Sequence, residues 1–211
     1  IYIIDASGYI YRAYHAITNM TNTSGQSTNA LFGFVRSLTK LIKDFNPKNV
    51  ICIFDGPDST KKRKEIYQEY KSHRVAMPED LRHQIQWAQD YCTLAGIPFL
   101  AVPEVEADDT IGSIAKWAED DFDAVFLCTT DKDMAQLVND KVRLLNTYKD
   151  NLVIDPTGVV EQYGVRPDQI LDYLALTGDA SDNIPGVTGF GAKTAASLLN
   201  EFDTLDNALI N

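Results

Sequence analysis

Residues 50–56, VICIFDG, place five apolar side chains directly before an aspartate and a glycine. A short apolar run that ends in turn-forming residues is typical of a strand buried on both faces. Residues 1–4, 97–102 and 124–128 have the same character, and residues 31–45 carry apolar side chains at helical spacing. This alternation of strands and helices predicts an α/β fold with a mostly parallel sheet that is flanked by helices.

The second part of the chain has a different pattern. Beyond about residue 156 the strand signal fades, and Gly, Pro and Asp clusters separate four segments with helical character: 156–163, 167–177, 191–200 and 203–210. Two further helices are expected within the first part, at residues 79–95 and around residues 111–118. We therefore divide the chain into an α/β core at residues 1–156 and a helical region at residues 157–211.

Acidic residues gather where the predicted strands end. The acids that follow the four strands are Asp5, Asp55, Glu106, Asp108, Asp109, Asp131 and Asp133, and the helical region adds Asp179 and Asp182. The carboxyl ends of parallel strands meet at one edge of the sheet, where open α/β folds bind ligands. Each acid alone is more simply explained as a helix cap or a turn former. Together they would repel one another strongly, and a cation would relieve that repulsion.

Carboxylate oxygens without nitrogen or sulfur ligands favour a hard ion such as Mg²⁺, with Mn²⁺ as a substitute. The three histidines (His15, His73 and His83) are not adjacent to the acids in the sequence, and surface or packing roles explain them better. Two ions in such a site can activate a water and stabilise the leaving oxygen of a phosphodiester. The acids thus predict metal-assisted phosphate chemistry.

Charge is sorted along the chain, so the net charge of −11 does not exclude a nucleic-acid partner. Residues 104–133 hold ten acids against two lysines, whereas residues 61–74, KKRKEIYQEYKSHR, have a local net charge of +4. On a helix, Lys71 and Arg74 would share a face and present cations to phosphates, with Tyr70 close by. A solvated, charge-rich helix explains the same segment without any ligand.

A glycine-rich stretch precedes the predicted helix at 191–200. Residues 181–199, SDNIPGVTGFGAKTAASLL, place three glycines where free backbone N–H groups at a helix start can hold a phosphate. The stretch fails as a P-loop, because Ala192 stands where a glycine is required before Lys193 and no strand precedes it. A connector between packed helices remains the alternative.

Taken together, these segments resemble the 5′-nuclease family, and most closely the 5′–3′ exonuclease domain of bacterial DNA polymerase I. The matching segments are IIDASGYIYRAYHA (3–16), FDG (54–56), YKSHR (70–74), VEADDTIGSIA (105–115), TTDKDMAQLV (129–138) and LTGDASDNIPGVTGFGAKTAA (176–196). They cover nearly the whole chain in the family's order. The resemblance implies a PIN-like nuclease core, a helical arch inserted at about residues 60–80, and a C-terminal helix–hairpin–helix.

The resemblance also implies roles for individual residues. Asp5, Asp55, Glu106, Asp108, Asp109 and Asp131 would form one metal cluster, and Asp133, Asp179 and Asp182 would complete the surroundings of a second ion. Lys71 and Arg74 would steer the scissile phosphate from the arch, Tyr70 would stack near the first bases, and Arg12 would support the same region. The hairpin residues Gly186, Gly189, Gly191, Lys193 and Thr194 would grip the duplex backbone, with K⁺ as a monovalent cofactor.

The implied activity is hydrolysis of DNA with a 5′ flap, a nick or a 5′ end, as in primer removal and repair, with little sequence specificity. We expect a cytoplasmic monomer without a membrane segment, because three scattered cysteines and no long apolar run fit that setting. We also expect a fragment of a longer chain, and the sequence leaves open whether a polymerase domain follows in that parent. Two alternatives stay open: a non-catalytic DNA-binding member of the same fold, and a metal-dependent phosphatase for small esters.

Overall fold

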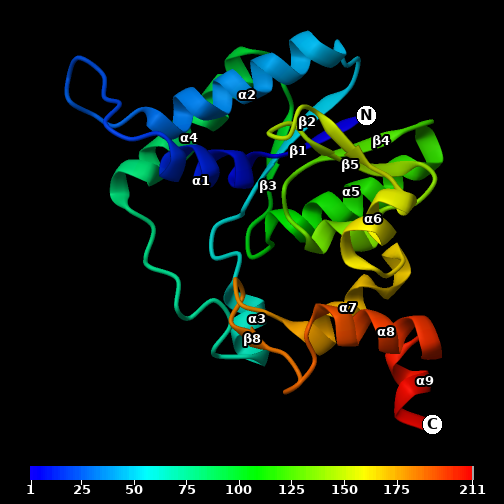
Figure 1. Ribbon diagram of the computed structural model, residues 1–211. Helices are drawn as coiled ribbons and strands as arrows, with labels where there is room; N and C mark the ends of the chain where they lie inside the picture. The colour runs from blue at the N-terminus through cyan, green and yellow to red at the C-terminus, as the bar shows by residue number, and fades with distance from the viewer. Residues whose placement is uncertain (211) are drawn as a thin grey trace.

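The computed structural model describes residues 1–210 and contains a six-stranded sheet (Figure 1). Its strands are β1 (Tyr2–Asp5), β2 (Val50–Phe54), β3 (Phe99–Ala101), β4 (Val125–Cys128), β5 (Val142–Asn146) and β6 (Leu152–Ile154). The spatial order is β3-β2-β1-β4-β5-β6, and β5–β6 is the antiparallel pair among otherwise parallel neighbours. The four predicted parallel strands are confirmed.

Helices cover both faces of the sheet. Successive strand residues point to opposite faces, so an apolar strand presents apolar side chains to the helices on each side. Ile3 packs with α5 (Ala107–Asp121) in one apolar cluster, whereas its neighbour Ile4 packs with the opposite helices in a second cluster. These opposite helices are α1 (Ala6–Ala16), α2 (Asn29–Phe45) and α4 (Glu79–Leu94). Both isoleucines are fully buried, so β1 forms the centre of a three-layer core.

The order of the strands places a topological switch point between β1 and β4. The chain builds β1, β2 and β3 outward on one side, then crosses to β4 on the other side of β1. Loops that leave the two adjacent strands turn in opposite directions at such a point and leave a crevice at the carboxyl ends. Asp5 is the last residue of β1, and Asp131 closely follows the end of β4. An acid therefore stands where each of these two strands reaches the crevice.

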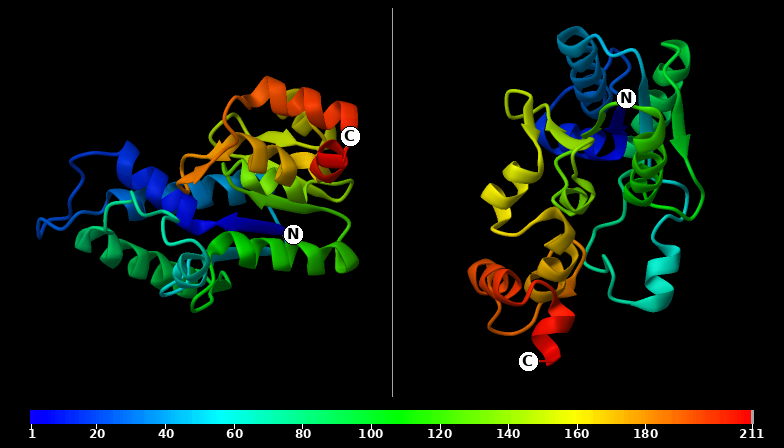
Figure 2. Two further views of the ribbon diagram at one scale, coloured as in Figure 1. Left: turned by 90° about the horizontal axis from the view of Figure 1, so that it is seen from below. Right: turned by 90° about the vertical axis from the view of Figure 1, so that its right-hand side faces the viewer.

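The helical region packs onto the same core. It comprises α6 (Pro156–Tyr163), η2 (Pro167–Gln169), α7 (Ile170–Thr177), α8 (Ala192–Phe202) and α9 (Leu205–Ile210), together with the short hairpin β7 (Gly178–Asp179) and β8 (Ile184–Pro185). A further short helix, η1 (Asp133–Leu137), lies in the core between β4 and β5. Ile170 and Leu199 belong to the apolar cluster that also contains Ile3. The helices α7, α8 and α9 lie together at the end of the molecule away from α1 and α2 (Figure 2).

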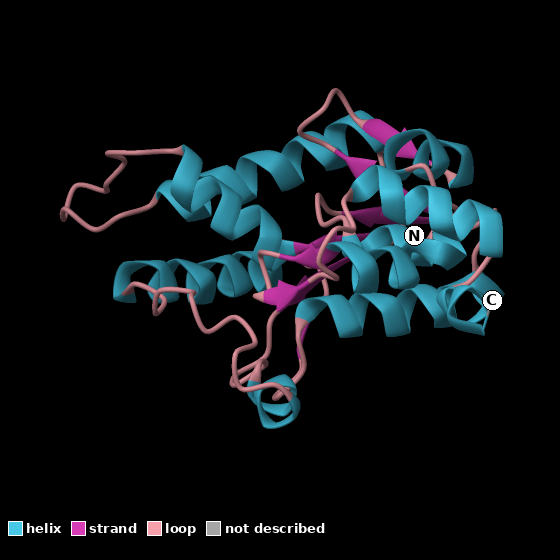
Figure 3. Cartoon of the chain, turned by 60° about the horizontal axis from the view of Figure 1, so that its bottom comes forward, coloured by secondary structure: helices cyan, strands magenta, loops and turns pink. Residues whose placement is uncertain are grey.

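The segment at residues 60–80 contains a single short helix. This helix, α3 (Lys61–Ile66), is followed by turns and an extended stretch that leads to α4 (Figure 3). Residues 67–74 form no helix, so Lys71 and Arg74 do not share the helix face that was considered for them. The backbone turns extended at Tyr67 and left-handed at Lys71, which has a φ of 52°, and neither conformation continues a helix.

Other differences concern local elements. The predictions omit α1, β5 and β6, and β3 is shorter than the predicted strand at residues 97–102. Asp5 begins α1 by accepting a hydrogen bond from the Gly8 amide at 2.7 Å, so the helix-cap role considered for each single acid applies to Asp5. No helix within residues 1–210 has the length and apolar character needed to cross a membrane.

Candidate metal centre and nucleic-acid interface

A cleft of about 770 Å³ opens at the carboxyl ends of β1, β2 and β4. The acids that line it are Asp5, Asp55, Glu106, Asp108, Asp131, Asp133, Asp179 and Asp182. Eight of the nine acids singled out in the sequence therefore share one cavity, although they are spread from residue 5 to residue 182. Lys71 and Arg74 line the same cleft.

The first acids are held rigidly by the ends of the strands. Asp5 is buried, and its second carboxylate oxygen accepts a hydrogen bond from the Thr129 hydroxyl at 2.8 Å. Asp55 accepts one from the Ala107 amide at 2.9 Å, which caps the start of α5. Burial first, with smaller contributions from the charges of Asp55 and Asp131, raises the pKa of Asp5 to about 6, while the hydrogen bonds from Gly8 and Thr129 oppose the rise.

Asp108 shows the strongest electrostatic crowding in the cleft. Burial first, and then the carboxylates of Asp131, Asp5 and Asp55, raise the pKa of Asp108 to about 8. The pKa of Asp133 rises to about 6 for the same reasons, with burial first and Asp131 and Asp179 next. Like charges held this close favour either protonation or a bound cation.

Glu106 forms the inner wall of the cleft and contacts two residues of the segment after α3. Its side chain is 4% exposed, and the Lys71 ammonium group lies against one of its carboxylate oxygens. The Tyr70 hydroxyl donates to the same oxygen at 3.2 Å and to Asp182 at 3.0 Å. Lys71 thus supplies the positive charge that this part of the cleft needs.

Three acids form a second group, which the Lys71 ammonium group links to Glu106 because it lies 3.5 Å from Asp182. Asp133, Asp179 and Asp182 each offer a carboxylate oxygen, and these oxygens lie within 4.8 Å of one another. Burial opposes ionisation of Asp179, but hydrogen bonds from Ser181 and the Lys132 ammonium at 3.1 Å lower its pKa. Arg74 donates to Asp182 at 3.0 Å.

The donor set fits divalent cations. All the groups offered are carboxylates, the preferred ligands of Mg²⁺ and Mn²⁺. Two buried oxygens, Oε1 of Glu106 and Oδ1 of Asp133, accept no hydrogen bond from the described residues, although the Arg63 guanidinium is 3.4 Å from the first. Buried carboxylate oxygens without a hydrogen-bond donor need an alternative partner, which a metal ion provides.

Besides the hairpin residues, three predicted site residues do not line the cleft: Asp109, Arg12 and Tyr70, whose buried side chain is not open to a base. Asp109 is exposed on α5 and pairs with the Arg63 guanidinium through two hydrogen bonds of 2.7 and 2.9 Å, which lower its pKa. Arg12 lies over the ring of Tyr148, 4.4 Å from its centroid, in a separate pocket that also reaches Asp131. It is thus separated from Tyr70, which it was expected to support.

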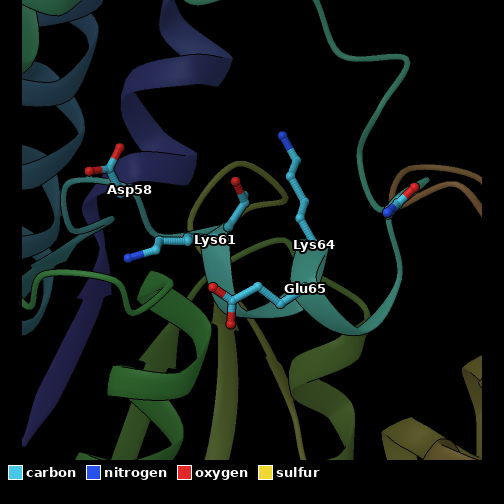
Figure 4. A pocket seen from close by; sticks show the side chains of 6 residues that line it. Asp58, Lys61, Lys64 and Glu65 are labelled. Carbon is cyan, nitrogen blue, oxygen red and sulfur yellow. The ribbon is translucent and has the colours of Figure 1, made fainter.

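The basic residues of α3 do not enter the cleft either. Lys61 and Lys64 project from the helix in different directions and, with Asp58 and Glu65, border an open hollow on its surface (Figure 4). Lys61 pairs with Glu104 at 2.5 Å. The cations of this segment that line the cleft come after α3: Lys71, which is 9% exposed, and Arg74, which is half exposed. Arg63 of α3 approaches Glu106 at 3.4 Å without lining the cleft.

Between α7 and α8, the glycine-rich stretch forms a hairpin that precedes the start of α8. Gly186 packs against the end of α7, where a Cβ atom would lie 2.4 Å from the Thr177 carbonyl carbon. Gly189 has a φ of 90° and Gly191 precedes α8, and a Cβ at either would meet no described atom within 4 Å. Lys193 and Thr194 follow in the first turn of α8 and are exposed.

Part of the lining of the cleft was not anticipated from the sequence. The side chains of this part are Tyr11, Tyr14, His15, Val75, Met77, Pro78 and Leu81. Sequence reasoning also missed Thr129, Lys132 and Ser181, which hydrogen bond or pair with predicted ligands. Each of these three stands within two residues of such an acid in the sequence. Closeness to the acids along the chain could therefore have identified them.

Comparison with known proteins agrees with this geometry. Residues 1–164 match the model of the 5′-3′ exonuclease N-terminal resolvase-like domain, and residues 165–211 match that of the 5′-3′ exonuclease C-terminal SAM fold. The boundary between these models lies beyond the predicted boundary at residue 156.

Three similar proteins illustrate the relationship. A 5′-3′ exonuclease of Aquifex aeolicus is 40% identical over 100% of this chain and 72% of its own length. The thermostable DNA polymerase I of Thermus aquaticus is 40% identical over 99% of the chain, but only 25% of the polymerase is covered. The structure of T5 5′-exonuclease with bound zinc ions has a TM-score of 0.80 at 25% identity, covering 100% of this chain and 78% of that one. The chain belongs to the 5′-3′ exonuclease family.

Proposed function

We propose that this chain hydrolyses phosphodiester bonds near the 5′ end of DNA, in flaps, nicks and 5′-ended duplexes, with Mg²⁺ as the cofactor. The observation that carries the proposal is the cleft in which eight carboxylates face Lys71 and Arg74. The acids suit divalent cations, and the two basic side chains suit the phosphate of a substrate. Removal of primers and repair of DNA are the processes that consume such substrates.

Asp5, Glu106, Asp108 and Asp131 would hold one ion, and Asp133, Asp179 and Asp182 would hold the other. Asp55, which accepts a hydrogen bond from the start of α5, would act through a water. When bound, the ions supply activation of a water nucleophile and stabilisation of the leaving oxygen. Lys71 and Arg74 would orient the scissile phosphate. Mn²⁺ would substitute, since it accepts the same oxygen ligands.

The rest of the surface fits a single-stranded end that joins a duplex. The tyrosines and apolar side chains that line the cleft would contact an unpaired nucleotide, because aromatic rings accept any base by stacking. The exposed start of α8, with Gly189, Gly191 and Lys193, would bind the duplex backbone without reading its sequence. K⁺ at this hairpin is part of the proposal. Arg12, beside Tyr148, would contact a neighbouring phosphate.

The test is cleavage of a 5′-labelled flap duplex with Mg²⁺ and with EDTA, beside the matched single strand and a small aryl phosphate ester. We expect metal-dependent release of a short 5′ product at the junction and no turnover of the ester. Asp131→Asn should be inactive, and Asp120→Asn, an exposed acid on α5, should cleave normally. Turnover of the ester alone would identify a phosphatase. Binding without cleavage would identify a non-catalytic DNA-binding protein.

A further inference from the structure

The position of Lys71 depends on an unusual backbone turn. Residues 67–73 are not helical, and Lys71 has a left-handed φ of 52°. A residue with a Cβ atom adopts this conformation only when its surroundings stabilise it. The strained conformation coincides with the burial of the Lys71 side chain against Glu106. Some other part of the molecule must therefore hold the turn.

That support comes from the tip of the hairpin between β7 and β8, which lies beside the segment after α3 (Figure 1). The Lys71 amide donates to the Asp182 carbonyl at 3.0 Å. The side-chain amide of Asn183 donates to the Glu69 carbonyl at 2.8 Å and to the Ser72 hydroxyl at 3.1 Å. Asn183 therefore bonds to the turn on both sides of Lys71.

Asn183 is suited to this task by its own geometry. It has a φ of 59°, and asparagine tolerates the left-handed conformation better than most residues. The carbonyl of Asn183 also accepts a hydrogen bond from the Tyr67 hydroxyl at 3.2 Å. Asn183 does not line the acidic cleft, so its contacts serve the turn rather than a metal ion or a substrate.

We propose that Asn183 is a positioning residue, which holds the turn at residues 69–72 and so places Lys71 in the cleft. The proposal rests on the proposed function for its catalytic consequence, but the contact itself can be tested without DNA or metal. Asn183 is also adjacent to Asp182, so the same loop supplies a carboxylate to the cleft and fixes the lysine opposite it.

Two variants separate the hydrogen bonds from the backbone. Asn183→Gly keeps the left-handed conformation accessible and removes the side chain. Asn183→Asp keeps the shape but cannot donate to the Glu69 carbonyl. The matched control is Asn46→Gly, because Asn46 also has a left-handed φ, 43°, and ends α2 far from this turn in the sequence. The two Asn→Gly substitutions thus introduce the same backbone flexibility at position 183 and at position 46.

The first readout is the rate of trypsin cleavage after Lys71 and Arg74 in the metal-free protein without DNA. Loss of two hydrogen bonds should raise that rate by roughly tenfold in both Asn183 variants, and Asn46→Gly should match the wild type. Unchanged protection in both variants would overturn the proposal. If trypsin cleaves the turn faster in the variants but the wild type never cuts flap DNA, the contact between Asn183 and the turn is supported and the proposed function is rejected.

The second readout is single-turnover cleavage of the flap duplex at saturating protein. Asn183→Gly should lower the rate by roughly tenfold while the Kd for DNA stays within about twofold of the wild type. In a Lys71→Ala background the same substitution should have no further effect, because Asn183 acts through that lysine. An equal loss in both backgrounds would overturn the assignment.

Discussion

The ammonium group of Lys71 contacts a carboxylate oxygen of Glu106 inside the acidic cleft, and both side chains are almost fully buried. Glu106 is one of the acids proposed to hold a divalent ion. Lys71 thus provides, in the protein without metal, part of the positive charge that the ion would provide. A bound ion and the Lys71–Glu106 pair compete for the same carboxylate.

Lys71→Met should therefore strengthen Mg²⁺ binding by roughly tenfold, because the ion no longer competes with the lysine. The same change should destabilise the metal-free protein by about 3–5 kcal/mol, since it leaves Glu106 buried without its partner. Isothermal titration calorimetry and thermal melts measure the two effects. The control is Lys116→Met, because the side chain of Lys116 is 82% exposed. Equal or weaker Mg²⁺ affinity in Lys71→Met would show that Lys71 and the ion do not compete.

Mg²⁺ should raise the melting temperature of chelator-treated protein. At a free concentration of one hundred times Kd, binding to the native state adds about 2.7 kcal/mol to the free energy of unfolding. For a chain of this size, that corresponds to a shift of roughly 5–10 °C. Differential scanning calorimetry with Mg²⁺ and with EDTA checks the shift. A melt that does not respond to millimolar Mg²⁺ would count against a preformed metal centre.

Without metal, the free energy of unfolding should fall as the pH rises from about 4 to about 8. The pKa values of Asp5 and Asp133 are raised to about 6 and that of Asp108 to about 8, from an ordinary value of 3.8. In this window the folded state binds more protons than the unfolded state, so stability present below pH 4 is lost as these groups ionise. Urea unfolding at a series of pH values measures the slope.

Asp108→Asn provides the internal check on that slope. The variant should remove the part of the decline between about pH 6 and pH 8, because Asp108 is the acid whose pKa reaches that range. Saturating Mg²⁺ should flatten the same part of the curve in the wild type. A decline at pH 6–8 that persists in Asp108→Asn would assign it to another group.

Asp131→Asn should lower the cleavage rate by roughly 100-fold or more and leave the affinity for flap DNA nearly unchanged. Asp131 lines the cleft and accepts a hydrogen bond from the Asp133 amide at 2.9 Å, whereas no residue of α8 lines that cleft. Rapid-quench kinetics and a binding titration in Ca²⁺ separate the two effects. Loss of DNA binding in a folded variant would give Asp131 a structural role.

Lys193→Ala should weaken DNA binding similarly for all sequences. If the side chain contacts a phosphate, the slope of log Kd against log salt concentration should decrease by about 1. Fluorescence anisotropy at several salt concentrations measures this slope. Lys43→Ala, at an exposed position on α2, is the matched control and should leave it unchanged. A change confined to particular DNA sequences would indicate base recognition instead.

Much of this molecule was determined by the sequence itself. The apolar runs before Asp5 and Asp55 predict parallel strands, because a strand buried on both faces must be apolar throughout. Parallel strands end at one edge of the sheet, so the seven acids after them were expected to meet, and six of the seven do. The four segments of helical character after residue 156 were also predicted, since their glycine and proline boundaries are local signals.

The tertiary structure decided which residue faces which. Lys71 and Arg74 share no helix face, since the chain turns left-handed at Lys71 and the hairpin tip holds it there. Asp109 stands beside Asp108 in the sequence, yet it points to Arg63 and away from the cleft, because adjacent residues on a helix face different directions. Periodicity fixes the elements and their buried faces. The contacts between Asn183 and the turn, and between Lys71 and Glu106, join residues 114 and 35 positions apart, and only packing brings such residues together.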